Sequence, residues 1–375
     1  MASDQPAVIV LPTRIAQPIA ALWAAWTVAL LGLGGPAWGA PRVGGRSAWQ
    51  LPEVAARRLS DDAADGHLDD FDFLTAALIA SGVESPSRRQ MLRDRFDGWW
   101  RERSIELQRI REPREQARVL LHALHSDIFR GQYYAACAHV DQTLTQGHFN
   151  CVTATVLFHE AALRLGLPDR IVSVPGHVFN RLVFPRQSID VQTTSSTWLD
   201  PQAPRPAVPE GPERWLTEVQ LIGKLYYNRG VARLAQHRYR ASAQLFRTAL
   251  AWDPQDLSAS QNLLAALNNG ALAAAERHRY FEALGLLREG LQFDPQFQPL
   301  EANYRHIAEA GVKELLAQAR PDAARRLLQE AAQATLRERR WIARQQHSVA
   351  RWEEARQRPS VPYWDTADDL TTAAP

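Results

Sequence analysis

A repeat in the last third of the chain constrains the fold more than any other feature of the sequence. The segment HRYRASAQLFRTALAWDP aligns with HRYFEALGLLREGLQFDP, so that Tyr280 follows Tyr239 at an interval of 41 residues, and the same shift leads to RPDAARRLLQEAA. The alignment gives one column of large apolar residues and one of small residues: Phe246, Leu287 and Leu328 in the first, and Ser242, Ala283 and Ala324 in the second. Stacked helical hairpins require this pattern, because each repeat buries one face against the next. Residues 213–335 are therefore predicted to form an all-α repeat domain.

The repeat resembles the tetratricopeptide repeat. The best-matched feature is the Asp-Pro pair that closes the second helix, at Asp253-Pro254 and Asp294-Pro295. The usual period of that family is about 34 residues, so the longer period here predicts longer first helices. The resemblance implies a concave groove that binds a peptide or a partner protein. Residues 336–358 are expected to form a C-terminal helix, and residues 359–375 a disordered tail.

The first forty residues indicate export from the cytoplasm. Arg14 precedes an uncharged stretch that contains IAALWAAWTVALLGLGG and ends in small residues, which is the layout of a signal peptide cut before Ala40. We expect residues 1–39 to be the signal peptide and residues 40–67 to be a linker. An uncleaved membrane anchor is the alternative, since about 20 apolar residues suffice to span a bilayer. Both interpretations predict a periplasmic or secreted protein, with membrane contact only if the segment stays uncleaved.

The overall charge gives no reason to expect a nucleic-acid partner. The chain has 375 residues, enough for two domains, with 43 basic and 41 acidic residues and a formal net charge of +2. A charge so close to zero produces no long-range attraction for phosphate. The charge itself does not indicate which partner the chain binds; a protein or peptide partner is what the repeat resemblance implies.

The middle of the chain predicts an α+β domain over residues 68–200. Helical periodicity begins at Leu68, and Ser85-Pro86 is typical of a helix start. The segment CVTATVLFHEAALRLGL reads as a helix, and RIVSV, HVFNRLVF and SIDVQTT read as short strands. The Pro-rich stretch 201–212 can continue neither helix nor strand, and it is predicted to be the linker between the two domains.

Three residues of this middle region form a candidate nucleophilic site. Cys151 opens the predicted helix, where backbone N–H groups and the helix dipole are expected to lower the pKa of a thiol. His177 opens a strand and could accept the thiol proton, and Asp190 on the next strand could orient the imidazole. An oxyanion needs donors; the Cys151 N–H is the first, and Gln132, His148 and Asn150 are candidates for the second.

The stretch from Asn150 through SIDVQTT resembles the bacterial branch of the transglutaminase-like superfamily, which is related to papain-like enzymes. The resemblance implies a helix packed on a small antiparallel sheet and assigns Cys151, His177 and Asp190 to a catalytic triad. It implies acyl transfer from amide or peptide bonds through a thioester, with no cofactor. Hydrolysis is favoured over amine transfer, because water is the default acceptor.

Other interpretations of these residues stay open. Cys137 and Cys151 could form a disulfide, which is common in exported proteins. The repeats could instead be the whole function, on an inactive transglutaminase-like platform. A metal site at His139 and His148 is not expected, because no closely spaced set of three ligands accompanies them.

Overall fold

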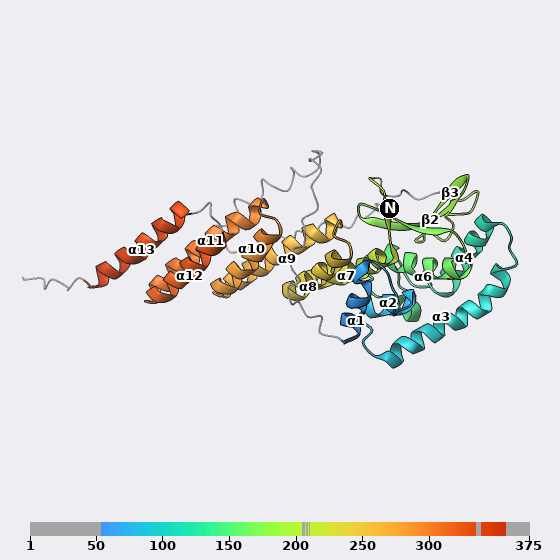
Figure 1. The fold of residues 1–375 in the computed structure, drawn as a ribbon, viewed down its shortest axis with the longest axis horizontal. Helices are drawn as coiled ribbons and strands as arrows, with labels where there is room; N and C mark the ends of the chain where they lie inside the picture. Colours follow the sequence, from blue (N-terminus) through green and yellow to red (C-terminus); the bar gives the residue numbers. More distant parts are fainter. Residues whose placement is uncertain (1–53, 205–206, 208, 210, 335–338, 358–375) are drawn as a thin grey trace, which may run out of the picture. The chain divides into compact units, whose positions relative to one another are not determined.

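The computed structural model describes residues 54–204, 207, 209, 211–334 and 339–357, with two compact units that divide between Gly270 and Ala271 (Figure 1). The predicted signal peptide and the predicted C-terminal tail lie outside the described residues. No helix among the residues described is long and apolar enough to cross a membrane.

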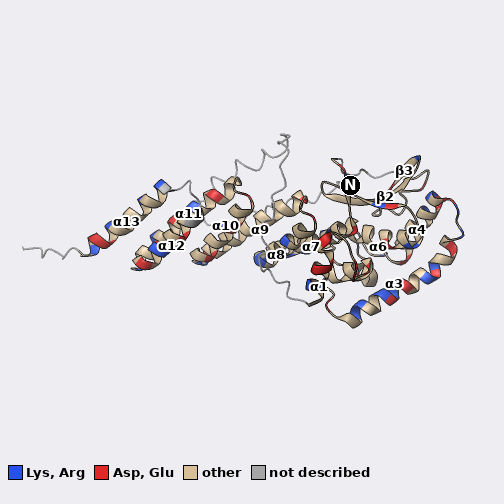
Figure 2. Ribbon diagram, viewed as in Figure 1, with Lys and Arg blue, Asp and Glu red and all other residues tan. Residues whose placement is uncertain are grey.

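The first unit begins with a group of helices. These are α1 (Val54–Asp62), the 3-10 turn η2 (Ala63–Asp65), α2 (Phe73–Ala80), α3 (Pro86–Leu107), α4 (Pro113–Asp127) and α5 (Val140–Gln146). Ser85 caps α3 by accepting a hydrogen bond from the backbone N–H of Arg88, and Pro86 follows at the first helical position, as the sequence predicts. Charged residues of both signs alternate along α3 (Figure 2).

The predicted linker over residues 40–67 is wrong for residues 54–65, which form α1 and η2. Leu59 is fully buried, and Ala56 and Ala63 are nearly so. Burial of these side chains holds a helix that local sequence preference alone does not specify. Residues 40–53 lie outside the described part of the chain.

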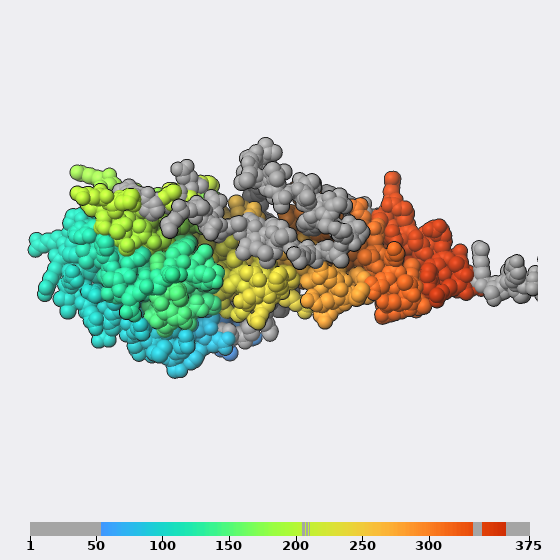
Figure 3. Space-filling view, turned by 180° about the vertical axis from the view of Figure 1, so that it is seen from behind, coloured from blue at the N-terminus to red at the C-terminus, as the bar shows by residue number. Residues whose placement is uncertain are grey.

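A four-stranded antiparallel sheet follows, in the order β3-β2-β1-β4. Its strands are β1 (Asp169–Val174), β2 (His177–Phe184), β3 (Gln187–Val191) and β4 (Arg214–Leu216). Helix α6 (Cys151–Arg164) precedes the sheet and packs against β1 and β2. In Figure 3 the chain of β2 and β3, in yellow-green, lies above the green and teal surface of the preceding helices. The helices and this small sheet confirm the α+β class.

The Pro-rich stretch 201–212 was predicted to link two domains, but it does not lie between the two compact units. The residues that follow it return to the sheet as β4, where Leu216 pairs with Ile171 of β1. Helix α7 (Glu218–Ala235) then packs on α2 and α6. These contacts place the first helical hairpin in the same unit as the sheet.

The helical hairpins keep the 41-residue period of the sequence. Tyr239, Tyr280 and Pro321 begin α8 (Tyr239–Trp252), α10 (Tyr280–Phe293) and α12 (Pro321–Ala334). Between them in the chain lie α9 (Leu257–Glu276), in which the two units divide, and α11 (Gln298–Ala317). The apolar and small columns are fully buried: Ser242, Phe246, Ala283, Leu287, Ala324 and Leu328. The helices keep the predicted period, although the predicted repeat domain 213–335 is divided between the two units. Helix α13 (Arg339–Gln357) follows where a C-terminal helix is expected.

Candidate active site

Cys151 is the first residue of α6, as predicted. Asn150 caps the helix by accepting a hydrogen bond from the Thr153 backbone N–H at 3.0 Å, and the Thr153 hydroxyl accepts from the Asn150 backbone N–H at 3.1 Å. This reciprocal capping fixes where the helix begins. The backbone N–H groups of Cys151 and Val152, at this helix start, favour the thiolate form of Cys151.

The thiol of Cys151 lies against β2. The backbone N–H of Val178, the residue after His177, also favours the thiolate form of Cys151. One turn further along α6, the Thr155 hydroxyl donates to the Val178 carbonyl at 3.4 Å. Cys151 and Thr155 thus hold the start of α6 beside the start of β2, which brings the thiol close to the backbone of His177.

Burial changes the expected electrostatics of the site. Although the three N–H donors favour the thiolate, burial dominates and raises the pKa of the Cys151 thiol. Burial also lowers the pKa of His177, against the opposing hydrogen bond from this ring to Gln192. The expectation of a lowered thiol pKa is therefore wrong, because removal from water penalises the charged form more than the helix terminus stabilises it. Cys151 and His177 are both neutral near pH 7.

Gln192, and not Asp190, orients the histidine ring. Nε2 of His177 donates to Oε1 of Gln192 at 2.6 Å. Asp190 lies opposite Arg181 across β2 and β3 and forms an ion pair with it, while Arg181 also binds Glu213. The assignment of Asp190 to the triad is wrong in this geometry, because its carboxylate is already engaged by a cross-strand arginine. No hydrogen bond joins the Cys151 sulfur to the His177 ring among the described side chains.

The three candidates for the second oxyanion donor have different environments. The Asn150 side chain is occupied, since it caps α6 and also donates to the Ala135 carbonyl at 3.1 Å. Gln132 is exposed, in a segment that pairs with the residues just before Cys151 through the hydrogen bond from Tyr134 N–H to the Phe149 carbonyl. His148 has a buried Nδ1 atom without a hydrogen-bond partner. Gln132 and His148 remain candidates, and Asn150 is a capping residue.

Cys137 and Cys151 are both free thiols in the structure. Cys137 is fully buried, and its thiol donates to the His148 carbonyl at 3.4 Å. The part of the chain that is described holds no cluster of three or more His, Cys, Asp or Glu side chains suited to a metal ion.

Helix α7 contributes neighbours that sequence reasoning missed. The positive charge of Lys224 acts on the Cys151 thiol, and Lys224 itself is held by Asp256 at 2.8 Å. Tyr227 of α7 has a pKa raised to about 12, mainly by burial, with a smaller contribution from Cys151. No spacing pattern links α7 to Cys151 in the sequence, because tertiary packing alone brings them together.

Comparison with family models, curated proteins and solved structures finds no match to this chain.

Proposed function

We propose that the chain is an exported, transglutaminase-like cysteine enzyme that cleaves amide or peptide bonds through a thioester. The observation that carries the proposal is the position of Cys151 at the junction of α6 and β2, where the backbone N–H groups of Cys151, Val152 and Val178 favour the thiolate. Such donors stabilise negative charge on the sulfur and on a bound carbonyl oxygen. The helical repeats are proposed to be tetratricopeptide-like and to recruit a protein or peptide partner.

The proposed reaction starts from a neutral thiol and a neutral imidazole. Because Nε2–H of His177 is bound to Gln192, Nδ1 carries the lone pair that accepts the thiol proton as sulfur attacks the carbonyl carbon. The carbonyl oxygen becomes an oxyanion that the Cys151 N–H stabilises. The imidazolium then protonates the leaving amine as the C–N bond breaks, which leaves a thioester. Water, activated by His177, releases the acid and restores the thiol.

A side-chain amide can serve as the third member of such a triad, the group that orients the histidine ring. Papain-like enzymes use a Cys-His-Asn arrangement in which the amide oxygen fixes the imidazole tautomer. Gln192 makes the same kind of contact here. A neutral amide stabilises imidazolium less than a carboxylate does, which suits a pair that starts uncharged.

The test is alkylation of the full chain with iodoacetamide from about pH 5 to 9, the range that brackets activated and ordinary thiols. We expect Cys151 to be labelled and buried Cys137 to be protected. Because burial lowers the pKa of His177, His177 stays an effective base below its ordinary pKa of about 6.5, and labelling falls only at more acidic pH. His177→Ala should slow labelling at least about tenfold near neutral pH, and Cys137→Ala should leave it unchanged.

A second candidate is a binding protein with an inactive transglutaminase-like platform. The raised pKa of Cys151 and the missing hydrogen bond between Cys151 and His177 favour it. In this case labelling of Cys151 would be slow, with the pH profile of an ordinary thiol, and unchanged by His177→Ala. That result would contradict the proposal that Cys151 is a catalytic nucleophile.

A further inference from the structure

The half-buried His125 lies in the last turn of α4 and has no part in the chemistry proposed above. Its Nε2–H donates a hydrogen bond to the Thr193 carbonyl at 2.9 Å, and its ring meets the Phe149 ring edge-on at a centroid distance of 5.4 Å. Phe149 precedes Cys151 by two residues, whereas Thr193 directly follows Gln192. One ring therefore contacts both the segment that leads into the thiol and the segment that orients the base.

The side chain that orients His177 lies beyond the paired part of the sheet. The pairing of β2 with β3 ends at Asn180 and Val191. The chain turns immediately afterwards, where the Ser195 backbone N–H donates to the Gln192 carbonyl at 3.0 Å. Gln192 thus occupies the first position of a turn, one residue past the ladder, and its place depends on what holds that turn.

Thr193 ties this turn to two helices. Burial lowers the pKa of His125, and the neutral ring carries its single proton on Nε2, because the Thr193 carbonyl can only accept. The Thr155 hydroxyl donates its own proton to the Val178 carbonyl, so it accepts the proton of the Thr193 hydroxyl at 3.2 Å. Both threonines are almost completely buried. The turn is consequently joined to α4 through His125 and to α6 through Thr155.

The aromatic contact holds the other half of the site. Phe149 is buried and stacks on Phe129 at 5.1 Å, and its carbonyl accepts from the Tyr134 backbone N–H at 2.8 Å. The His125 ring lies edge-on to both phenylalanines. Because such aromatic packing is favourable and directional, it restricts movement of the segment that enters α6.

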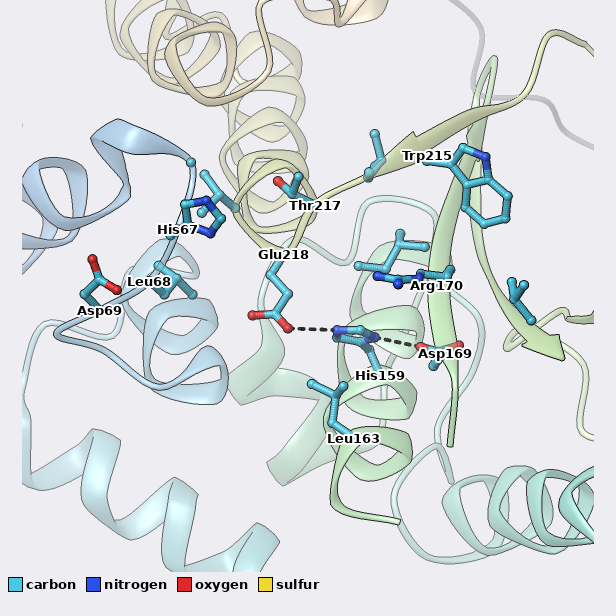
Figure 4. Close-up of a pocket in the computed structure, with 15 residues that line it drawn as sticks. His67, Leu68, Asp69, His159, Leu163, Asp169, Arg170, Trp215, Thr217 and Glu218 are labelled. Atoms are coloured by element: carbon cyan, nitrogen blue, oxygen red, sulfur yellow. Dashed lines mark hydrogen bonds and ion pairs between the residues drawn. The ribbon is translucent and has the colours of Figure 1, made fainter. Parts of the chain in front are cut away.

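A different histidine anchors the far end of α6. His159 binds Asp169 of β1 through Nδ1 at 2.6 Å and Glu218 of α7 through Nε2 at 3.3 Å, in the wall of a pocket (Figure 4). These bonds hold α6 against β1 and α7. His125 instead links the start of α6 to the turn that carries Gln192.

We infer that His125 is a positioning residue for the thiol site. By binding the Thr193 carbonyl it holds the turn from which Gln192 reaches His177, and by packing on Phe149 it holds the entry to α6. The role in catalysis rests on the proposed function, whereas the clamp between the two segments does not. His125→Phe keeps a ring beside Phe149 and removes the donor, and His125→Gln keeps an N–H donor and removes the ring.

The first test is spectroscopic and needs no activity. Nε2–H of His177, bound to Gln192 at 2.6 Å, should give a slowly exchanging imidazole signal in nitrogen–proton correlation spectra of the full chain, identified by its absence from His177→Ala. We expect His125→Phe to lose this signal and His125→Gln to keep it. The matched control is His122→Phe, which should keep the signal, since His122 on the same helix binds Asp200 at 2.8 Å. Survival of the signal in His125→Phe would overturn the inference.

The second test is iodoacetamide labelling of Cys151 over the same pH range. His125→Phe should slow labelling about fivefold near neutral pH, the factor that one hydrogen bond represents, and shift the profile toward that of an ordinary thiol. Thr155→Val, which removes the bond from α6 to Thr193 at nearly constant shape, is the second variant and should have the same effect. Unchanged rates and pH profiles in the folded variants would contradict the positioning role. A wild-type rate that His177→Ala leaves unchanged refutes only the proposed function, because the imidazole signal still tests the clamp.

Discussion

At the scale of single residues, two side chains on one face of β3 and just beyond it have different roles. Asp190 and Gln192 are two positions apart, so both point to the same side of the sheet. Asp190 is opposite Arg181 and engaged by it, whereas Gln192 reaches His177 at 2.6 Å. The distinction separates a residue that stabilises the hairpin from one that positions a base.

Gln192→Ala should therefore lower the rate of Cys151 alkylation, and of any amide cleavage, about tenfold. One hydrogen bond of about 1.4 kcal/mol that holds the imidazole corresponds to this factor. Asp190→Asn should leave both rates within about twofold and lower the melting temperature slightly, because a partly exposed ion pair contributes at most about 1 kcal/mol. The measurement is iodoacetamide labelling followed by mass spectrometry of the Cys151 peptide. The reverse order of the two effects would restore Asp190 to the site.

Much of this site could be predicted from the sequence. The Asn150 and Thr153 pair marks the helix start at Cys151, and a two-residue turn at Pro185-Arg186 fixes the register. Counting back from the pair Phe184–Gln187 places Asp190 opposite Arg181, and the next residue on that face is Gln192. The pKa of the thiol was not predictable, because it depends on how completely the rest of the fold removes Cys151 from water.

At the scale of elements, the 41-residue repeat predicts the long helices, whereas local sequence preference does not predict the short elements. Helices α8, α10 and α12 begin 41 residues apart. The turn just before each of them contains a residue with positive φ: His237, His278 and Ala319. The three-residue β4 has no such pattern and exists because it pairs with β1. Short elements that depend on tertiary partners are the ones that sequence periodicity misses.

Two helical glycines of the second unit test how closely the hairpins pack. A Cβ added to Gly311 would lie 2.6 Å from Leu327 Cδ2 and 2.7 Å from Tyr280 Cγ, whereas one added to Gly285 would meet nothing within 4 Å. Gly311→Ala should destabilise the unit by about 1–3 kcal/mol through overpacking. Gly285→Ala should stabilise it by about 0.5–1 kcal/mol through helix propensity. Urea unfolding followed by circular dichroism measures both, and a neutral Gly311→Ala would show that these helices do not approach closely.

At the scale of the whole molecule, the boundary between the compact units does not coincide with the change in sequence composition at the Pro-rich stretch. The Pro-rich stretch 201–212 marks a break in periodicity, yet α7 on its far side packs on α2 and α6. The Arg214–Asp253 ion pair, at 2.6 Å, also joins β4 to the end of α8. Prolines show where helices and strands must stop, but only the contacts decide where a unit ends, and these divide the chain within α9.

Each unit should therefore respond separately to damage in its own core. Leu328 in α12 and Leu182 in β2 are both fully buried, and truncating either to alanine should cost about 2–5 kcal/mol. Leu328→Ala should increase hydrogen exchange in α11 and α12 and leave the rate of Cys151 alkylation unchanged. Leu182→Ala, the matched change in the first unit, should alter that rate and leave exchange in α11 and α12 as it is. If Leu328→Ala changed Cys151 alkylation as much as Leu182→Ala does, the repeats and the thiol site would form one cooperative unit, and binding in the repeats could then regulate the thiol directly.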